Sequence, residues 1–346
     1  MGPHPAVAAV RHAVRGALAE FEPGDLLLAA CSGGADSLAL AAALAFEAPR
    51  AGLRAGGVTV DHGLQAGSAG RAADVARILT GLSLSPVLSV PAAGARPGDQ
   101  AGYPGPEAAA RAARYTALAA AAAGSQAAAV VLGHTLDDQA ETVLLGLARG
   151  SGARSLAGMA PRSDGYLRPL LAIRRAQTQE ACAALGLTYW SDPHNQDPAF
   201  ARSRLRGHAL PALEADLGPG VAEALARTAG LLRDDADALD ELAAEAAARL
   251  AGAAQDGPGP AAGWPAAELV VLPAAIRRRV LRAAALAAGC PAGQLTRQHL
   301  AWLEELVTGW HGQHGTDLPG GVSCERRYGR LLFTRTAEAE DRRGRS

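Results

Sequence analysis

The chain has 346 residues, of which 49% are hydrophobic and 19% are charged. This composition excludes a globally disordered protein and suits two folded domains. The formal net charge of −1 excludes the global basic field that many nucleic-acid binders carry, although a local basic patch remains open.

The basic residues number 33, and all of them are arginine. The lack of lysine excludes a Walker-type phosphate loop and Schiff-base catalysis, both of which need a lysine side chain. The four cysteines form no CxxC pair, so a zinc ribbon is not indicated. Because no secretory apolar segment or long uncharged apolar run is present, we expect a soluble cytoplasmic protein without a membrane span.

Short apolar runs alternate with helical stretches along the first 190 residues. The runs predict strands at residues 25–30, 57–60, 85–90 and 128–132, and the stretches predict helices at residues 37–46, 69–79, 107–123 and 136–148. Such alternation favours βαβ units and a parallel sheet, with ligands at the carboxyl ends of its strands. The Gly- and Pro-rich residues 91–106 predict a surface loop.

The character of the chain changes near residue 216. The pattern predicts a long helix or helix pair at residues 220–250, a linker at 251–263, helices at 273–288 and 296–308, and a hairpin at 321–334. We therefore expect an α/β domain over residues 1–215 and a smaller, mainly helical domain with a terminal hairpin over residues 216–336. Residues 337–346 predict a flexible tail.

The segment CSGGADS, residues 31–37, comes directly after a predicted strand and opens a predicted helix. Adjacent glycines let backbone N–H groups form a nest for anions, and the helix adds its positive end. Asp36 would repel a phosphate unless a Mg²⁺ ion lay between them. The alternative is a plain glycine turn in which Ser37 and Asp36 cap the helix.

Two further segments come after predicted strands. In VDHGLQ, residues 60–65, Asp61 and His62 would lie at the rim of the same cleft, or Asp61 would only cap the next element of the chain. In residues 133–152, Asp137 and Glu141 are four residues apart and share a helix face, where they could ligate magnesium or hold an amine. Thr135 and Asp138 fit a capping box.

Other candidates on these segments carry positive charge or can gain it. His134 precedes the predicted helix at residues 136–148 and is either a buried, satisfied histidine or a ligand in the cleft. Arginines at helical spacing could contact phosphates or form ordinary solvated faces. These arginines are the pairs Arg111 with Arg114, Arg202 with Arg206, and Arg278 with Arg282.

The motifs, in the order in which they occur along the chain, are similar to those of a known enzyme family. SGGADS, VDHGL, the segment 133–152, LRPLL (residues 167–171) and DPHNQDPAFARSRLR (residues 192–206) resemble the tRNA(Ile)-lysidine synthetase family, within the PP-loop superfamily of ATP pyrophosphatases. The resemblance covers residues 24–215 densely and continues more weakly to the hairpin. Gln65 stands where the family usually has arginine, and Ser203 where it usually has asparagine.

The resemblance implies a ligase that forms a carbon–nitrogen bond. It would adenylate C2 of the wobble cytidine of tRNA(Ile) with a CAU anticodon, and then replace AMP by free lysine. ATP would bind Ser32, Gly33, Gly34, Ala35, Asp36 and Ser37, with Asp61 and His62 nearby and Mg²⁺ at Asp36. His134, Asp137 and Glu141 would join Asp36 in catalysis, and Asp137 with Glu141 would hold lysine. The arginine pairs named above would contact tRNA. Arg278 and Arg282 would do so as part of a tRNA-binding domain formed by residues 216–336.

Two other functions stay open on the sequence. Another PP-loop tRNA-modifying enzyme, such as a 2-thiocytidine synthetase, would share the ATP loop, but that chemistry usually needs paired cysteines. A tRNA-binding relative without catalysis would not need an intact SGGADS, Asp137 and Glu141. The sequence leaves the oligomeric state open, a homodimer included.

Overall fold

The computed structural model describes residues 2–61, 63, 67–92, 106–190, 197, 199–255 and 263–335. They form two compact units, residues 1–233 and 234–346. The helix α10 (Val221–Gln255) begins in the first unit and ends in the second. It is one continuous helix, and it occupies the first residues of the predicted linker at 251–263, so that part of the linker prediction is wrong.

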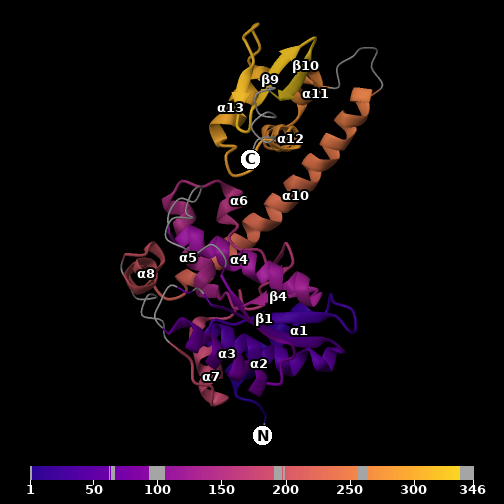
Figure 1. Ribbon diagram of the computed structural model, residues 1–346. Coiled ribbons are helices and arrows are strands. Elements are labelled where there is room, and N and C mark those ends of the chain that lie inside the picture. Colours follow the sequence, from indigo (N-terminus) through magenta and orange to yellow (C-terminus); the bar gives the residue numbers. More distant parts are fainter. Residues whose placement is uncertain are drawn as a thin grey trace. The chain divides into compact units, whose positions relative to one another are not determined.

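The first unit is built on a six-stranded sheet with the order β3-β2-β1-β4-β6-β5, of which Figure 1 labels the neighbouring strands β1 and β4. Five strands are parallel, and only β5 runs antiparallel, against β6. Chain order reverses between β1 and β4, and ligands of open α/β sheets bind at such a point. The strands are β1 (Leu26–Ala30), β2 (Arg54–Asp61), β3 (Val87–Pro91), β4 (Ala129–Leu132), β5 (Arg162–Ser163) and β6 (Tyr166–Leu167).

Helices cover both faces of this sheet, because alternate residues of each strand point to opposite faces. Leu27 and Ala29 of β1 pack in a cluster with residues of α1, α2, α3 and α7, while Leu28 packs on the other face with Leu118 of α4. These helices are α1 (Pro5–Leu18), α2 (Ala35–Glu47), α3 (Ser68–Gly81), α4 (Pro106–Ser125) and α7 (Arg175–Ala184).

The predicted α/β architecture is confirmed, and each predicted strand and helix of residues 25–148 appears in the structure. The sequence analysis did not anticipate α1, β5, β6 or α7. The rest of the first unit is helical: α5 (Leu136–Ala148), α6 (Ala153–Leu156), α8 (Ala201–Arg204), a π-helix (Leu205–Ala209) and α9 (Leu210–Leu217). Of the predicted loop at 91–106, residues 93–105 lie outside the described residues.

The second unit joins the C-terminal part of α10 and three further helices to an antiparallel sheet of order β7-β10-β9-β8. Its core gathers Leu269, Val280, Leu303 and Leu331. The predicted hairpin is confirmed as β9 (Val322–Arg327) and β10 (Arg330–Arg335). The other elements are β7 (Trp264–Pro265), α11 (Ala266–Val271), α12 (Ala274–Ala287), α13 (Arg297–Thr308) and β8 (Thr316–Leu318). The predicted tail at 337–346 lies outside the described residues.

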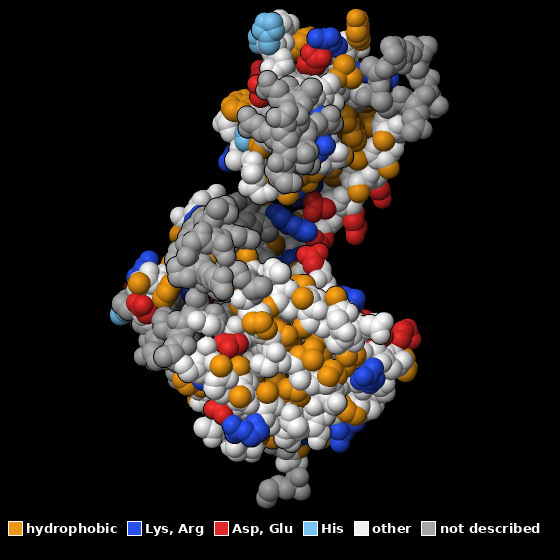
Figure 2. All heavy atoms as spheres, in the orientation of Figure 1, with side chains coloured by type: hydrophobic (Ala, Val, Ile, Leu, Met, Phe, Trp, Pro, Cys, Tyr) orange, Lys and Arg blue, Asp and Glu red, His pale blue; other side chains and the backbone are white. Residues whose placement is uncertain are grey.

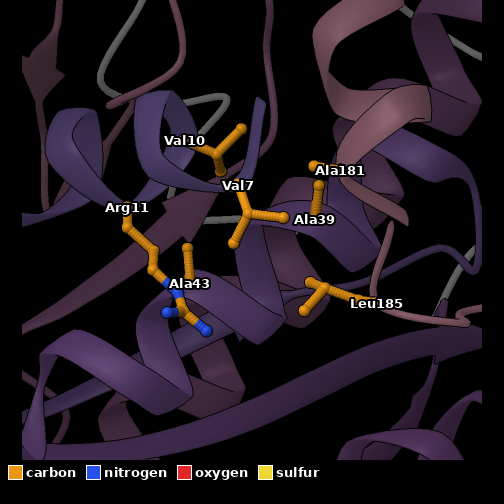
Figure 3. A pocket seen from close by; sticks show the side chains of 7 residues that line it. All are labelled: Val7, Val10, Arg11, Ala39, Ala43, Ala181 and Leu185. Atoms are coloured by element: carbon orange, nitrogen blue, oxygen red, sulfur yellow. The ribbon is translucent and has the colours of Figure 1, made fainter. Parts of the chain in front are cut away.

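The charged side chains of the described residues on one face of the molecule form no large patch of a single sign. On the face in Figure 2, outside the grey residues, blue and red side chains are scattered among uncharged ones. A small pocket between α1, α2 and α7 is apolar except for Arg11 (Figure 3). None of its lining residues belongs to the predicted motifs, so this pocket is not the predicted active site. Among the described residues, no helix is long and apolar enough to cross a membrane.

Candidate active site

The loop between β1 and α2 has the backbone shape of an anion-binding turn. Gly33 adopts a positive φ of 87°, and a Cβ atom there would lie 2.9 Å from Val75 Cγ2, so both conformation and space require glycine. Ser37 Oγ donates to the Gly34 carbonyl at 2.9 Å and accepts from the Ser32 N–H at 3.2 Å. These bonds fix the loop at the N-terminus of α2, with Ala35 and Asp36 in its first turn.

A second glycine brings the end of β4 against this loop. A Cβ atom on Gly133 would lie 3.0 Å from the Asp36 carbonyl carbon and 3.1 Å from Ser37 Cα. Since β1 and β4 are neighbours in the sheet, their carboxyl ends place Asp36 beside the start of α5. The two strongest motifs of the sequence therefore meet at one site.

Asp36, Asp137, Asp138 and Glu141, which we call the carboxylate cluster, surround the guanidinium of Arg175. Arg175 lies 2.7 Å from Asp138, 3.4 Å from Asp36 and 3.5 Å from Glu141. Its backbone N–H also donates to Asp137 Oδ2 at 2.7 Å. One arginine at the start of α7 thus ties together acids from α2 and α5.

Two more arginines complete the carboxylate cluster. Arg206 Nε lies 2.9 Å from Glu141 Oε1, and its Nη2 lies 3.4 Å from Asp138 Oδ1. Arg174 lies 3.6 Å from Asp137. Thr178 donates a hydrogen bond to Asp36. The side chain of Glu141 is only 1% exposed, so its charge depends on Arg206 and Arg175 for compensation.

The two acids at the centre of the cluster titrate differently. Burial raises the pKa of Asp36, and the nearby Asp138 adds to the rise, although Thr178 and Arg175 oppose it. Burial also raises the pKa of Asp138, but Arg175 and the hydrogen bonds from Thr135 outweigh it, so this pKa ends below its ordinary value. The predicted capping box between Thr135 and Asp138 is present and explains part of the difference.

A second group, the arginine cluster, consists of Arg111, Arg114, Arg168 and Arg202. The first three act on His134, and Arg202 acts on Arg114. Burial lowers the pKa of Arg114, and Arg111 and Arg202 lower it further. Burial likewise lowers the pKa of His134 to about 4, with Arg168, Arg114 and Arg111 adding to the effect against Asp138. His134 is therefore neutral at pH 7, and its Nδ1 is buried without a hydrogen-bond partner among the described residues.

No ion pair joins Arg114 or Arg202 to any acid among the residues that the structure describes. Arg114 instead lies against the Tyr115 ring, at 5.7 Å from its centroid, and Arg111 donates to the Tyr115 hydroxyl at 3.2 Å. Arg114 and Arg202 are half-buried and Arg111 is exposed, so positive charge gathers here at a partly accessible surface where an anion could bind. The arrangement is that of an anion-binding site beside the carboxylate cluster.

The remaining predicted residues are distributed over the chain. Asp61 ends β2, where its side chain accepts from the Gly63 N–H at 3.0 Å, while His62 and Gln65 lie outside the described residues. Arg202 and Arg206 were expected to share a helix face. Arg206 lies in a π-helix and pairs with Glu141 of the carboxylate cluster, whereas Arg202 lies in α8 and acts on Arg114.

The predicted arginines of the second unit differ in their partners. Arg278 pairs with Glu304 at 2.6 Å, whereas Arg282 is exposed and has no ion pair among the described residues. Both belong to a different unit from the carboxylate and arginine clusters. A role for them must therefore be argued from their own unit.

Sequence reasoning missed the residues that organise the carboxylate cluster, namely Arg174, Arg175 and Thr178. One signal could have found them. Arg174 and Arg175 stand at the N-cap and first position of α7, where the helix dipole disfavours a cation. Two arginines placed against the dipole indicate nearby acids. Arg168 was part of the quoted motif LRPLL but was given no role.

Comparisons with known proteins fit this geometry. Residues 9–213 match the PP-loop domain family, and residues 265–332 match the TilS substrate binding domain family. The tRNA(Ile)-lysidine synthase of Thermobifida fusca is 59% identical over 333 residues, covering 96% of this chain and 99% of that protein. The chain belongs to the tRNA(Ile)-lysidine synthase family. The predicted family and ligase class are thereby confirmed.

Two other matches are a second relative of nearly equal length and a more distant solved structure. The tRNA(Ile)-lysidine synthase of Streptomyces coelicolor is 54% identical over 362 residues, covering 96% of this chain and 99% of that protein. A solved U34-tRNA thiolase from Methanococcus maripaludis, with its [4Fe-4S] cluster, has a TM-score of 0.55 at 19% identity and covers 66% of this chain and 80% of that one. At 19% identity, the likeness to the thiolase supports the fold of this chain and says nothing of its function.

Proposed function

We propose that the two charge clusters perform the two steps of lysidine formation on tRNA(Ile) with a CAU anticodon. The observation that carries the proposal is their juxtaposition. The arginine cluster lacks an anionic partner among the described residues, and the carboxylate cluster begins at Asp36, within the phosphate loop itself. ATP and tRNA supply phosphate groups, and lysine supplies an ammonium group, so each cluster suits one kind of ligand.

In the first step the C2 oxygen of the wobble cytidine attacks the α-phosphate of ATP, and pyrophosphate leaves. The loop Ser32–Ser37 would hold the phosphates through backbone N–H groups and the positive end of α2. Asp36 fits a shared Mg²⁺ ion, because such ions take one or two carboxylates and complete their coordination with phosphate oxygens. Bound there, Mg²⁺ would neutralise charge on the phosphates. Asp61 and His62 would border the nucleotide.

In the second step the ε-amine of lysine attacks the activated C2 carbon, and AMP leaves. Asp137 and Glu141 would bind the lysine ammonium and take its proton before attack. Arg175 and Arg206 set the resting geometry of these carboxylates through their hydrogen bonds to them. Holding the reactants in place and stabilising charge would supply most of the acceleration.

The cytidine and its flanking phosphates would bind the arginine cluster. Arg111, Arg114 and Arg202 would contact phosphate, and neutral His134 would offer its unpartnered Nδ1 to the base. Arg206 would act at the carboxylate cluster as well as toward tRNA. The reaction would take place in the cytoplasm, where its three substrates meet.

The domain predicted at residues 216–336 would hold the body of the tRNA. Residues 265–332 match a family described as substrate-binding, and Arg282 is exposed on α12. Arg278 is paired with Glu304, so it would have to contact tRNA while it keeps this ion pair. The boundary of this domain, as a unit of function, stays a prediction.

The direct test is incorporation of radiolabelled lysine into a tRNA(Ile) transcript with a CAU anticodon. We expect incorporation that requires ATP and Mg²⁺, and none into a transcript with uridine at the wobble position. ATP–pyrophosphate exchange without lysine incorporation would instead support another PP-loop modification, such as 2-thiolation. Sedimentation of the same preparation tests for a homodimer.

A further inference from the structure

The turn of the β9–β10 hairpin places an aromatic side chain where the backbone disfavours it. Arg327 pairs with Arg330, which leaves Tyr328 and Gly329 as a two-residue turn. Both turn residues have positive φ, 49° for Tyr328 and 74° for Gly329. Such turns favour asparagine, aspartate or glycine at the first position, because a Cβ atom and a bulky side chain are strained there.

Exposure and charge add to this local cost. The side chain of Tyr328 is 96% exposed, so it packs into no core. Arg327 and Arg330 face each other directly across the strands, and like charges in that position destabilise a hairpin. Glu325 pairs with Arg327 at 2.9 Å, and Arg330 donates to the Gly263 carbonyl at 2.7 Å, so both guanidiniums are held beside the turn.

Three unfavourable choices at one turn call for a functional reason, since sequences depart from local preferences mainly at functional sites. The surrounding charge identifies the partner. Residues 265–332 contain eight arginines and five acidic residues, although the whole chain has a net charge of −1. An exposed ring between arginines matches the way proteins hold unpaired bases, by stacking on the base and pairing with its phosphate.

We propose that Tyr328 stacks on an unpaired base of the bound tRNA and that Arg327 contacts an adjacent phosphate. This deepens the proposed function and rests on it, because it assigns a base-stacking residue to the substrate-binding unit. Tyr328 is a binding residue at a distance in sequence from every motif of the chemistry, so its loss would affect tRNA binding and spare the chemical steps.

The test uses the full chain with Tyr328→Asn, which removes the ring and supplies the residue that the turn prefers. We expect tRNA affinity to fall about tenfold, within the range measured for base stacking. The melting temperature would be unchanged or higher, and the salt dependence of binding would be unchanged, because every arginine keeps its place. By contrast, Arg327→Gln would lower the slope of log affinity against log salt by about 0.7 to 0.9.

Two controls make the result specific. Tyr328→Phe keeps the ring and should bind tRNA as the wild type does. Val271→Asn removes another exposed apolar side chain of the same unit, 78% exposed, and should have no effect. In steady-state assays, Tyr328→Asn should raise KM for tRNA and leave kcat and the KM values for ATP and lysine unchanged.

Wild-type affinity of the Tyr328→Asn variant would overturn the inference, as would a change in its sedimentation without a change in tRNA binding, which would make Tyr328 a protein contact. If the wild type itself neither binds tRNA nor incorporates lysine, the proposed function fails instead, so the two failures are distinguishable.

Discussion

The carboxylate cluster and the arginine cluster of the first unit are satisfied in different ways. Each acid of the carboxylate cluster has a guanidinium or hydroxyl partner from α7 or the π-helix. In the arginine cluster, Arg114 and Arg202 have no acidic partner among the described residues, and burial with mutual repulsion lowers the pKa of Arg114. The first cluster is a closed network, whereas the second leaves positive charge for a ligand to neutralise.

The difference shows which of the two clusters can be explained by the stability of the fold alone. A buried acid with a matched arginine stabilises the native geometry once formed, so the carboxylate cluster would be retained without a ligand. Arginines that gather without acidic partners repel one another and contribute nothing to the stability of the fold, and proteins keep such arrangements where activity needs them. The arginine cluster is therefore the stronger indication of a substrate site.

The largest expected effect concerns Asp36, where the carboxylate cluster meets the phosphate loop. Asp36→Asn should lower pyrophosphate release on the order of 100-fold or more, because charge on the transferred phosphate loses its compensating site. tRNA binding should stay near the wild-type value. Asp74→Asn, at an exposed acid, is the matched control. Full activity of the Asp36 variant, or wild-type activity without Mg²⁺, would contradict the assignment.

The next effect separates lysine binding from ATP binding within the carboxylate cluster. Asp137→Ala and Glu141→Gln each remove one charged hydrogen-bond acceptor, and such a loss costs about 1.5–3 kcal/mol. We expect the KM for lysine to rise about 10- to 100-fold at saturating ATP and tRNA. Glu180→Gln, on the exposed side of α7, should change nothing. An unchanged lysine requirement with lost ATP binding would reassign these acids to magnesium.

A smaller effect is expected when the unpaired charge is removed. The double variant Arg114→Gln with Arg202→Gln should weaken tRNA binding and lower the log–log salt slope by about 0.7 to 0.9 for each arginine that binds a phosphate in the wild type. Its stability should be no lower than that of the wild type, because the repulsion between these two arginines is relieved. Arg77→Gln, an exposed arginine of α3, serves as control. Unchanged salt dependence would show that neither arginine contacts phosphate.

The last expected effect concerns stability rather than activity, and it is a dependence on pH. The folded-state pKa of His134, about 4, lies below the ordinary value of 6.5. As pH falls from 6.5 to about 4, the unfolded chain takes up a proton that the folded chain does not, so stability falls over this window and is regained as pH rises. His134→Asn should reduce that fall by on the order of 3 kcal/mol, measured by urea unfolding. The control His12→Asn, at an exposed histidine, should leave the fall in stability unchanged. An equal fall in both variants would contradict the burial of a neutral His134.

Local pattern was sufficient for much of the fold. Short apolar runs and glycine-ended loops predict β1, β2, β3 and β4 with their following helices, because strand and helix periods are local properties. The elements that were missed show where local pattern fails. The strands β5 and β6 have two residues each and form only by pairing with each other and with β4. The linker was predicted from alanine and glycine, yet α10 continues to Gln255.

The sequence by itself determined the phosphate loop, the capping box of α5 and the identity of the acids, since these depend on neighbours within a few residues. Only the tertiary structure decided what each charge faces. Arg175 reaches Asp36 across 139 positions of sequence, and Arg206 reaches Glu141 across 65, while Arg202, four residues from Arg206, joins the other cluster. Electrostatic interactions depend on distance through space and on burial, and neither is encoded in the spacing of residues along one helix.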